Sequence, residues 1–252
     1  MTESNIRIQM KDIHKSFGPV KPLQGVDLTL NKGECLGLLG DNGAGKSTLM
    51  KILSGVIIPD KGDFYFEDQK ITIKNPKDAK DLQIETVFQD LALCDTLSVA
   101  NNIFLGREPL KFGGRLIDKK KLHEKTREEL DKLGINISST KLTVENMSGG
   151  QRQAVAIARA MAFQPKVLIM DEPTAALGVK EVNMVLGLIN KVKKSGVSVI
   201  LITHRLQDLF VVCDRLMVLH EGKCIDNRTI DQYTLETVIN SIMGNPEGVH
   251  VS

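Results

Sequence analysis

Residues 40–48 read G-D-N-G-A-G-K-S-T, and this stretch constrains the chain more than any other. It contains the pattern G-x-x-x-x-G-K-S, with a short apolar run at 35–39 before it and a helix-compatible run at 47–53 after it. A buried strand that passes through a glycine-rich turn into a helix directs backbone N–H groups and the positive end of the helix dipole toward one point. The stretch therefore predicts a loop that binds phosphate, in preference to a turn that merely caps a helix.

The residue types in this loop indicate how it would hold a polyphosphate together with a magnesium ion. Lys46 is expected to neutralise the β- and γ-phosphates, and the hydroxyl of Ser47 is expected to bind Mg²⁺. Thr48 would support the phosphate side of the loop. The candidate phosphate-binding residues are Gly40, Asp41, Asn42, Gly43, Ala44, Gly45, Lys46, Ser47 and Thr48.

Composition sets the broad class of the protein. Its 252 residues are 42% hydrophobic, enough for one large domain or a core with an inserted subdomain. Lys and Arg number 33 against 31 for Asp and Glu, so the net charge of +2 provides no general attraction to nucleic acid or an anionic membrane. Residues 1–11 lack the apolar core of a signal peptide, no run approaches about 20 apolar residues, and the four cysteines form no C-x-x-C pair. We expect a globular cytosolic protein without a zinc site or disulfide framework.

Patterns of apolar residues predict β structure on both sides of the phosphate loop. Short apolar runs separated by turns over residues 6–34 indicate a small antiparallel sheet, and the β pattern continues at 62–67 and 71–73. A further strand at 84–88 ends at Gln89, whose amide would face a ligand crevice at the carboxyl end of that strand.

The second half of the chain contains more helical patterns. From about residue 90 to 146 the sequence becomes helical and charged, and we interpret this segment as an inserted helical subdomain. Its charged stretch at 118–133 is interpreted as a solvated helix face rather than a binding patch. Beyond a strand at 215–219, residues 221–252 predict a short turn and a C-terminal helical tail.

Polar residues that directly follow apolar runs are candidates for chemistry. The run at 167–170 ends in Asp171 and Glu172, the pattern of a buried strand that delivers acids to its tip. Asp171 fits an aspartate that holds Mg²⁺, and Glu172 fits a carboxylate that polarises the attacking water. The run at 196–203 ends at His204, whose imidazole could donate a hydrogen bond to a γ-phosphate oxygen.

Two other motifs leave alternatives open on the residues alone. Phe17 could fold back and stack on an adenine, or it could be an ordinary core or hairpin residue. The motif Ser148-Gly149-Gly150-Gln151 opens a helical run, where exposed N–H groups could contact a second phosphate. The same motif could also be a helix capped by its serine.

Taken in order, these motifs resemble those of the nucleotide-binding subunits of ABC transporters. The resemblance covers nearly the whole chain and rests on Phe17, residues 40–48, Gln89, residues 147–151, residues 170–174 and His204. It implies an α/β fold: a P-loop NTPase with a RecA-like core, an antiparallel β subdomain and an inserted helical subdomain. The expected single domain comprises a core with the β subdomain at 1–90 and 160–225, a helical subdomain with the signature motif at 91–159, and a C-terminal tail at 226–252.

The resemblance also assigns roles to the open candidates. Phe17 is similar to the aromatic residue that stacks on adenine, Gln89 to the glutamine that reaches Mg²⁺, and His204 to the switch histidine. The implied cofactors are ATP and Mg²⁺, with Ser47, Gln89 and Asp171 around the metal. Two chains are expected to close head to tail, so that Ser148, Gly149, Gly150 and Gln151 contact the nucleotide held by the partner.

The implied partners are membrane-spanning permease subunits, contacted by Gln89 and residues 90–106. The other implied partners are a second cassette, identical or not, and, indirectly, a periplasmic or extracellular solute-binding protein. Nucleic acid is not expected as a partner. The stretches 174–179 and 203–206 are similar to the ATPases of bacterial importers for ribose, galactose, xylose and fructose. We therefore expect a cytoplasmic ATPase, peripheral on the inner membrane face, that energises monosaccharide import. An exporter cassette and a soluble ABC ATPase acting on nucleic acid or ribosomes are the alternatives.

Two positions depart from the family pattern. Met147 stands where leucine is usual, a change of similar volume. Gly178 stands where the family usually has the aspartate that crosses the dimer interface.

Overall fold

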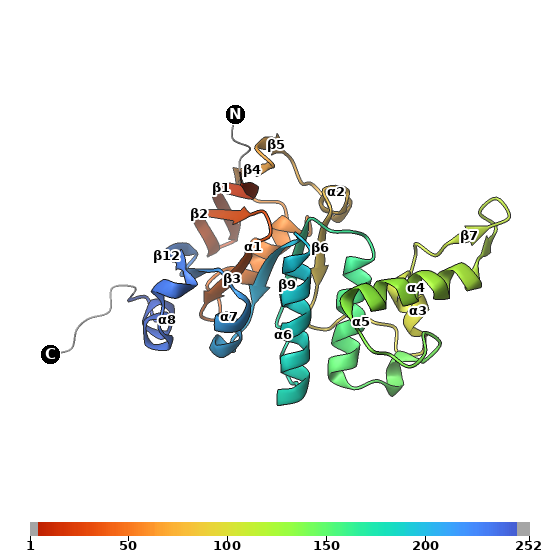
Figure 1. Ribbon diagram of the computed structural model, residues 1–252. Helices are drawn as coiled ribbons and strands as arrows, with labels where there is room; N and C mark the ends of the chain where they lie inside the picture. Colours follow the sequence, from red (N-terminus) through yellow and green to blue (C-terminus); the bar gives the residue numbers. More distant parts are fainter. Residues whose placement is uncertain (1–4, 246–252) are drawn as a thin grey trace.

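A six-stranded sheet forms the centre of the computed structural model, which describes residues 5–245 (Figure 1). Its strands lie in the order β12 (Lys223–Thr229), β11 (Arg215–His220), β3 (Cys35–Gly40), β10 (Ser198–Ile202), β9 (Val167–Asp171) and β6 (Ile84–Val87). Neighbours are parallel except β12, which runs antiparallel to β11. In this register Ile202 pairs with both Leu38 and Asp171, so the carboxyl ends of β3, β9 and β10 share one edge.

The central strands are buried along their length, as their continuous apolar runs predict. All residues of β3 and β10 are buried. The expectation of a turn and a helical tail after residue 221 is wrong in part, because β12 adds a strand before the helix begins. The sequence K-C-I-D-N-R-T of β12 lacks a clear apolar alternation, which is typical of an edge strand that only one neighbour supports.

A second, antiparallel sheet packs beside the first, as the sequence predicts. Its order is β2 (Val20–Asn31), β1 (Ile6–Phe17), β4 (Lys61–Phe66) and β5 (Gln69–Ile71). The strands β1 and β2 are longer than the apolar runs suggest, because bulges let β1 continue to Phe17. The strand expected at 71–73 lies slightly earlier, since β5 ends at Ile71.

Arg215 ties the two sheets together at the start of β11. Its Nε lies 2.7 Å from Oε1 of Glu34, and its Nη2 lies 3.0 Å from Oε2 of the same carboxylate. The guanidinium also donates to Asn227 of β12 and to the carbonyl oxygen of Thr29 in β2. Arg215 therefore links the antiparallel sheet, through Thr29, to β11 and β12 of the central sheet, and its ion pair with Glu34 lies at the turn between β2 and β3.

Helices cover both faces of the central sheet, and further helices lie to one side of it. They are α1 (Lys46–Leu53), α2 (Pro76–Asp81), α3 (Val99–Ile103), α4 (Lys119–Leu133), α5 (Gly149–Met161), α6 (Val179–Lys194), α7 (Leu206–Val212) and α8 (Leu235–Ile242), with short 3₁₀ helices η1 (Val144–Asn146) and η2 (Ile230–Gln232). In Figure 1, α3, α4 and α5 lie together beyond α6, in the region where the sequence predicts inserted helices. A two-stranded hairpin at its far end, β7 (Leu110–Lys111) and β8 (Leu116–Ile117), was not predicted; its four strand residues are all exposed.

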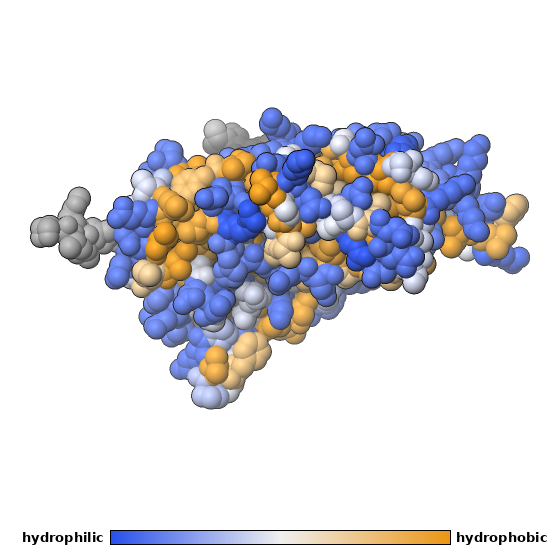
Figure 2. Space-filling model, turned by 90° about the horizontal axis from the view of Figure 1, so that it is seen from below, coloured by the Kyte–Doolittle hydropathy of each residue, from blue (hydrophilic) through white to orange (hydrophobic). Residues whose placement is uncertain are grey.

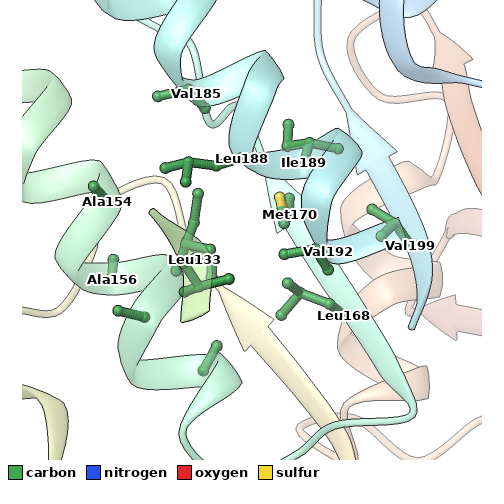
Figure 3. Close-up of a cluster of buried hydrophobic side chains, with 14 of the residues drawn as sticks. Leu133, Ala154, Ala156, Leu168, Met170, Val185, Leu188, Ile189, Val192 and Val199 are labelled. Atoms are coloured by element: carbon green, nitrogen blue, oxygen red, sulfur yellow. The ribbon is translucent and has the colours of Figure 1, made fainter. Parts of the chain in front are cut away.

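One large apolar cluster fastens these helices to the sheet (Figure 3). Ala154 and Ala156 on α5 are small, buried members of this cluster. Leu188 and Ile189 of α6 belong to the same cluster as Met170 of β9, which lies near them (Figure 3). Each fully buried aliphatic side chain of this kind contributes about 1.5–3 kcal/mol through burial. The cluster holds α5 and α6 against the central sheet.

Polar and apolar residues are interspersed on the surface. Seen from below the view of Figure 1, hydrophobic residues form separate patches among hydrophilic ones (Figure 2). Within residues 5–245, no helix has both the length and the apolar character needed to cross a bilayer.

Candidate functional site

A pocket of about 470 Å³ opens where β3, β9 and β10 end. Its lining residues are Phe17, Val20, Pro22, Asn42, Gly43, Ala44, Gly45, Lys46, Ser47, Thr48, Gln89, Asp171, Glu172, Ile202 and His204. Candidates from five separate parts of the sequence thus meet at one edge of the sheet. This is the position at which parallel α/β sheets place ligands.

Glycine is required at both ends of the phosphate-binding loop. Gly40 has φ +140°, and a Cβ there would lie 2.2 Å from the carbonyl oxygen of Leu219. Gly45 has φ +105°, and a Cβ there would lie 2.2 Å from the carbonyl oxygen of Pro22. The loop is therefore wedged between two backbone segments in a conformation that side chains do not tolerate. Gly40 and Asp41 shape the loop but do not line the pocket.

Lys46 supplies the buried positive charge of the loop. Its Nζ donates to the carbonyl oxygens of Gly40 at 2.7 Å and of Asp41 at 2.9 Å, so the ammonium lies across the loop. Burial lowers the pKa of Lys46, while the carboxylates of Glu172, Asp41 and Asp171 oppose this shift. A cation held over a glycine loop at a helix N-terminus fits a polyphosphate.

Asp171 is the last residue of β9, Glu172 follows it, and the charges of both carboxylates act on Lys46 of the loop. Burial raises the pKa of Asp171, against the opposing charge of Lys46. With the hydroxyl of Ser47 and the amide oxygen of Gln89, Asp171 forms a set of oxygen donors of the kind that Mg²⁺ prefers.

Glu172 is held in an unusual backbone conformation with one free carboxylate oxygen. Its φ is +51°, and its N–H donates to the carbonyl oxygen of Ile202 at 2.9 Å. Oε2 accepts from the backbone N–H of His204 at 3.4 Å, and the Nε2 atom of His204 lies 3.3 Å from Oε1. The latter contact lacks hydrogen-bond geometry, so Oε1 is a buried oxygen without a hydrogen-bond partner among the described residues. Burial also raises the pKa of Glu172, which strengthens it as a base.

Phe17 lies at the rim of the pocket rather than in the core. It is 49% exposed at the end of β1, and it pairs with Val20 across the hairpin. Val20 and Pro22, which the sequence reasoning missed, line the same side of the pocket. Val20 pairs with Phe17, but the place of both residues in the pocket depends on how the hairpin folds over the loop, for which the sequence has no local signal.

The structure does not bring Ser148, Gly149, Gly150 and Gln151 into this pocket. Ser148 caps α5: its Oγ accepts from the N–H of Gln151, whose side chain accepts from the N–H of Ser148. Ser148 and Gly149 are exposed, whereas Gly150 is buried. A single chain therefore presents this motif on a surface outside its own pocket.

Comparison with known proteins agrees with this geometry. Residues 23–175 match the family model for ABC transporter. A xylose/arabinose import ATP-binding protein of Sulfolobus acidocaldarius is 48% identical over 231 residues, covering 92% of this chain and 91% of that protein. A ribose import ATP-binding protein of Caldanaerobacter subterraneus is 42% identical over 94% of this chain, but this chain spans only 47% of that relative. The crystal structure of an ATP-binding cassette of an ABC transporter in its ADP conformation matches with a TM-score of 0.77 and 28% identity, covering 95% of this chain and 96% of that one.

An α/β sheet that ends in a glycine-rich loop with a buried lysine and two adjacent acids defines a P-loop NTPase. Within that class, this chain belongs to the ABC transporter family, as an ATP-binding subunit with ATP hydrolase activity.

Proposed function

We propose that this chain binds Mg²⁺ and ATP and uses hydrolysis to energise the import of a monosaccharide through membrane-spanning permease subunits. The observation that carries the proposal is the buried Oε1 atom of Glu172, which accepts no hydrogen bond within residues 5–245, lies 3.3 Å from Nε2 of His204 and shares one pocket with Lys46. A carboxylate oxygen that accepts no hydrogen bond, in a group with a raised pKa, is suited to accept a proton from water.

The residues of the pocket have different roles in hydrolysis. Lys46 and the loop N–H groups bind the phosphates, and Ser47, Asp171 and Gln89 hold the metal, whose charge offsets that of the phosphates. Phe17 stacks on the base at the rim.

Glu172 orients the attacking water, and its own placement depends on the carbonyl oxygen of Ile202 and the N–H of His204. The imidazole of His204 is 60% exposed and lines the pocket, so it can donate to a phosphate oxygen there.

A second cassette completes the site. The exposed Ser148 and Gly149 offer a hydroxyl and the N-terminal end of α5 to an anion on another molecule. Two chains arranged head to tail would each place this signature motif against the nucleotide in the other chain's pocket.

A groove beside the pocket is suited to a permease subunit. It has a volume of about 400 Å³, and its lining includes Phe88, Leu105, Phe163, Glu85 and Arg107. Two hydrogen bonds of 2.6 Å from Arg159 to the carbonyl oxygens of Leu91 and Ala92 hold the segment after Gln89 against this groove. A helix docked there would move with the segment that carries Gln89, and this is how closure would reach the transport path.

The proposal of a monosaccharide rests on the sugar importers among the relatives, whose names include xylose, arabinose and ribose. The proposed location is the cytoplasmic face of the membrane, with a solute-binding protein acting on the opposite side. The domain division into 1–90 and 160–225, 91–159 and 226–252 is likewise a proposal.

The test is the variant Glu172→Gln, which keeps the side-chain size but removes the base. We expect ATP hydrolysis to fall by about 10²–10⁴-fold while ATP affinity stays within about twofold, since the loop contacts are unchanged. Glu124→Gln, an exposed acid on α4, is the matched control and should hydrolyse ATP at the wild-type rate. Near-normal turnover of Glu172→Gln would remove Glu172 from this role.

A further inference from the structure

Glu181 lies between the signature motif and the segment that follows Glu172. Its Oε1 accepts from the N–H of Gly150 at 3.2 Å, and its Oε2 accepts from the N–H of Gly178 at 3.2 Å. Gly150 is in the first turn of α5, and Gly178 is the N-cap of α6. A single carboxylate therefore bridges the N-terminal ends of two helices.

The two helix starts are closely packed against each other. A Cβ on Gly150 would lie 2.9 Å from Cβ and Cγ of Glu181 and from Cε of Met184. A Cβ on Gly149 would lie 2.8 Å from Cδ2 of Leu177. Both glycines thus permit a close approach to the segment that starts α6.

Electrostatics favour an anion at this position. Both helix N-termini carry partial positive charge, and without a counter-charge they would repel each other. The hydroxyl of Ser148 and the N–H groups of Gly150 and Gly178 lower the pKa of Glu181, so its carboxylate is ionised at neutral pH. The carboxylate thus holds both termini, and it does so although position 178 has no acidic side chain of its own.

The carboxylate of Glu181 connects two parts of the molecule. In the proposed head-to-tail pair, these two parts would contact two different nucleotides. The chain from Glu172 to Gly178 is a compact turn: the N–H of Ala175 donates to the carbonyl oxygen of Glu172 at 3.1 Å, and the hydroxyl of Thr174 donates to Asp208 at 2.6 Å. The turn begins in this chain's own pocket, and the bridge ends on the motif that faces away from that pocket.

We infer that Glu181 is a positioning residue that sets the donors of the signature motif for the γ-phosphate of the partner's ATP and links that motif to this chain's own Glu172. The inference rests on the proposed function, because it requires that the signature motif contact nucleotide across a pair of chains. Glu181 itself does not line the pocket.

The test measures ATP-driven pairing in the Glu172→Gln background, where hydrolysis is slow. Light scattering gives the pairing constant with saturating ATP and Mg²⁺ for Glu172→Gln alone and with Glu181→Ala added. We expect Glu181→Ala to weaken pairing about tenfold or more, because two charge-assisted hydrogen bonds that order the motif are lost. ATP affinity of the unpaired chain should stay within about twofold, which a loss of folding would not allow. Adding Glu145→Ala instead, which removes an exposed acid near the motif, should leave pairing unchanged.

Mixing two variant chains tests whether Glu181 acts on the nucleotide site of the partner chain or only on the structure of its own chain. A mixture of Glu181→Ala and Lys46→Ala chains contains pairs in which one site has an intact loop and an intact signature motif. We expect this mixture to hydrolyse ATP several-fold faster than either variant alone. Absence of such recovery would place the effect of Glu181 in its own pocket and overturn the inference.

The outcomes distinguish the inference from the function on which it rests. Equal pairing with and without Glu181→Ala overturns the role of Glu181 and leaves the proposed function intact. No ATP-driven pairing of Glu172→Gln itself overturns the head-to-tail site, and the role of Glu181 with it.

Discussion

Arg215 offers the sharpest test of what holds the antiparallel sheet against the central sheet. Two of its four hydrogen bonds go to Glu34, one goes to Thr29 of β2 and one to Asn227 of β12, and its partner Glu34 is 8% exposed. In Arg215→Met the carboxylate of Glu34 keeps the N–H of Asn31 at 2.7 Å but loses its cation. An unpaired buried charge costs about 3–5 kcal/mol, and we expect the lower end because the Arg215 side chain retains 14% exposure.

The magnitude converts into a thermal shift. For chains of this size a loss of 1 kcal/mol lowers Tm by about 2–4 °C, so about 3 kcal/mol predicts a drop of about 6–12 °C. Urea unfolding followed by circular dichroism measures the free energy, and a thermal melt measures Tm. Replacing both partners, in Arg215→Met with Glu34→Leu, should recover at least half of the loss because no charge is left buried.

Lys61→Met provides the matched control. It breaks an ion pair with Asp12 in which the side chains are 70% and 54% exposed, and surface pairs of this kind contribute little. We expect no resolvable change in its unfolding midpoint. If Arg215→Met shifts the midpoint no more than Lys61→Met, the ion pair does not hold the two sheets together.

Two further predictions concern the loop and the C-terminal region. Gly45→Ala should lower ATP affinity at least tenfold, since its Cβ would lie 2.2 Å from the carbonyl oxygen of Pro22 at a φ of +105°. Isothermal titration calorimetry measures this affinity, and an affinity equal to that of the wild type would show that the loop can shift. Burial alone would raise the pKa of Asp226, but hydrogen bonds from Arg228 and Ser241 outweigh it and lower that pKa below the ordinary 3.8. Asp226 then stabilises the fold above pH 3.8, and this contribution is lost as pH falls through its lower folded-state pKa. Urea unfolding of wild type and Asp226→Asn at several pH values should show a stability difference that shrinks in acid; a constant difference would refute the assignment.

Much of the fold could be predicted because its signals are local. The runs that became β3, β9 and β10 are continuous and apolar, and the charged repeat of α4 begins and ends with its own caps, Asp118 and Gly134. The strand β12 and the β7–β8 hairpin were missed because their residues are polar or exposed and depend on a neighbour for pairing.

In the candidate site, too, some residues could be predicted from local signals in the sequence and others could not. Asp171, Glu172 and His204 could be placed together because each directly follows a parallel strand, and such strands end at one edge. Val20 and Pro22 could not, since their position depends on how the hairpin folds over the loop. Glu181 looks like an ordinary helix-capping residue in the sequence, and only the approach of α5 shows its second contact.

The separation of the loop from the signature motif has a consequence for how activity scales. If each working site needs a pocket from one chain and Ser148 from another, assembly follows mass action. For chains that are mostly unpaired, halving their concentration would leave a quarter of the assembled pairs. Two permease subunits that each hold one chain would raise the effective concentration of one for the other to the millimolar range. Attachment to the membrane would then keep two chains paired, so that the hydrolysis rate per chain would no longer fall as the concentration of the chain falls.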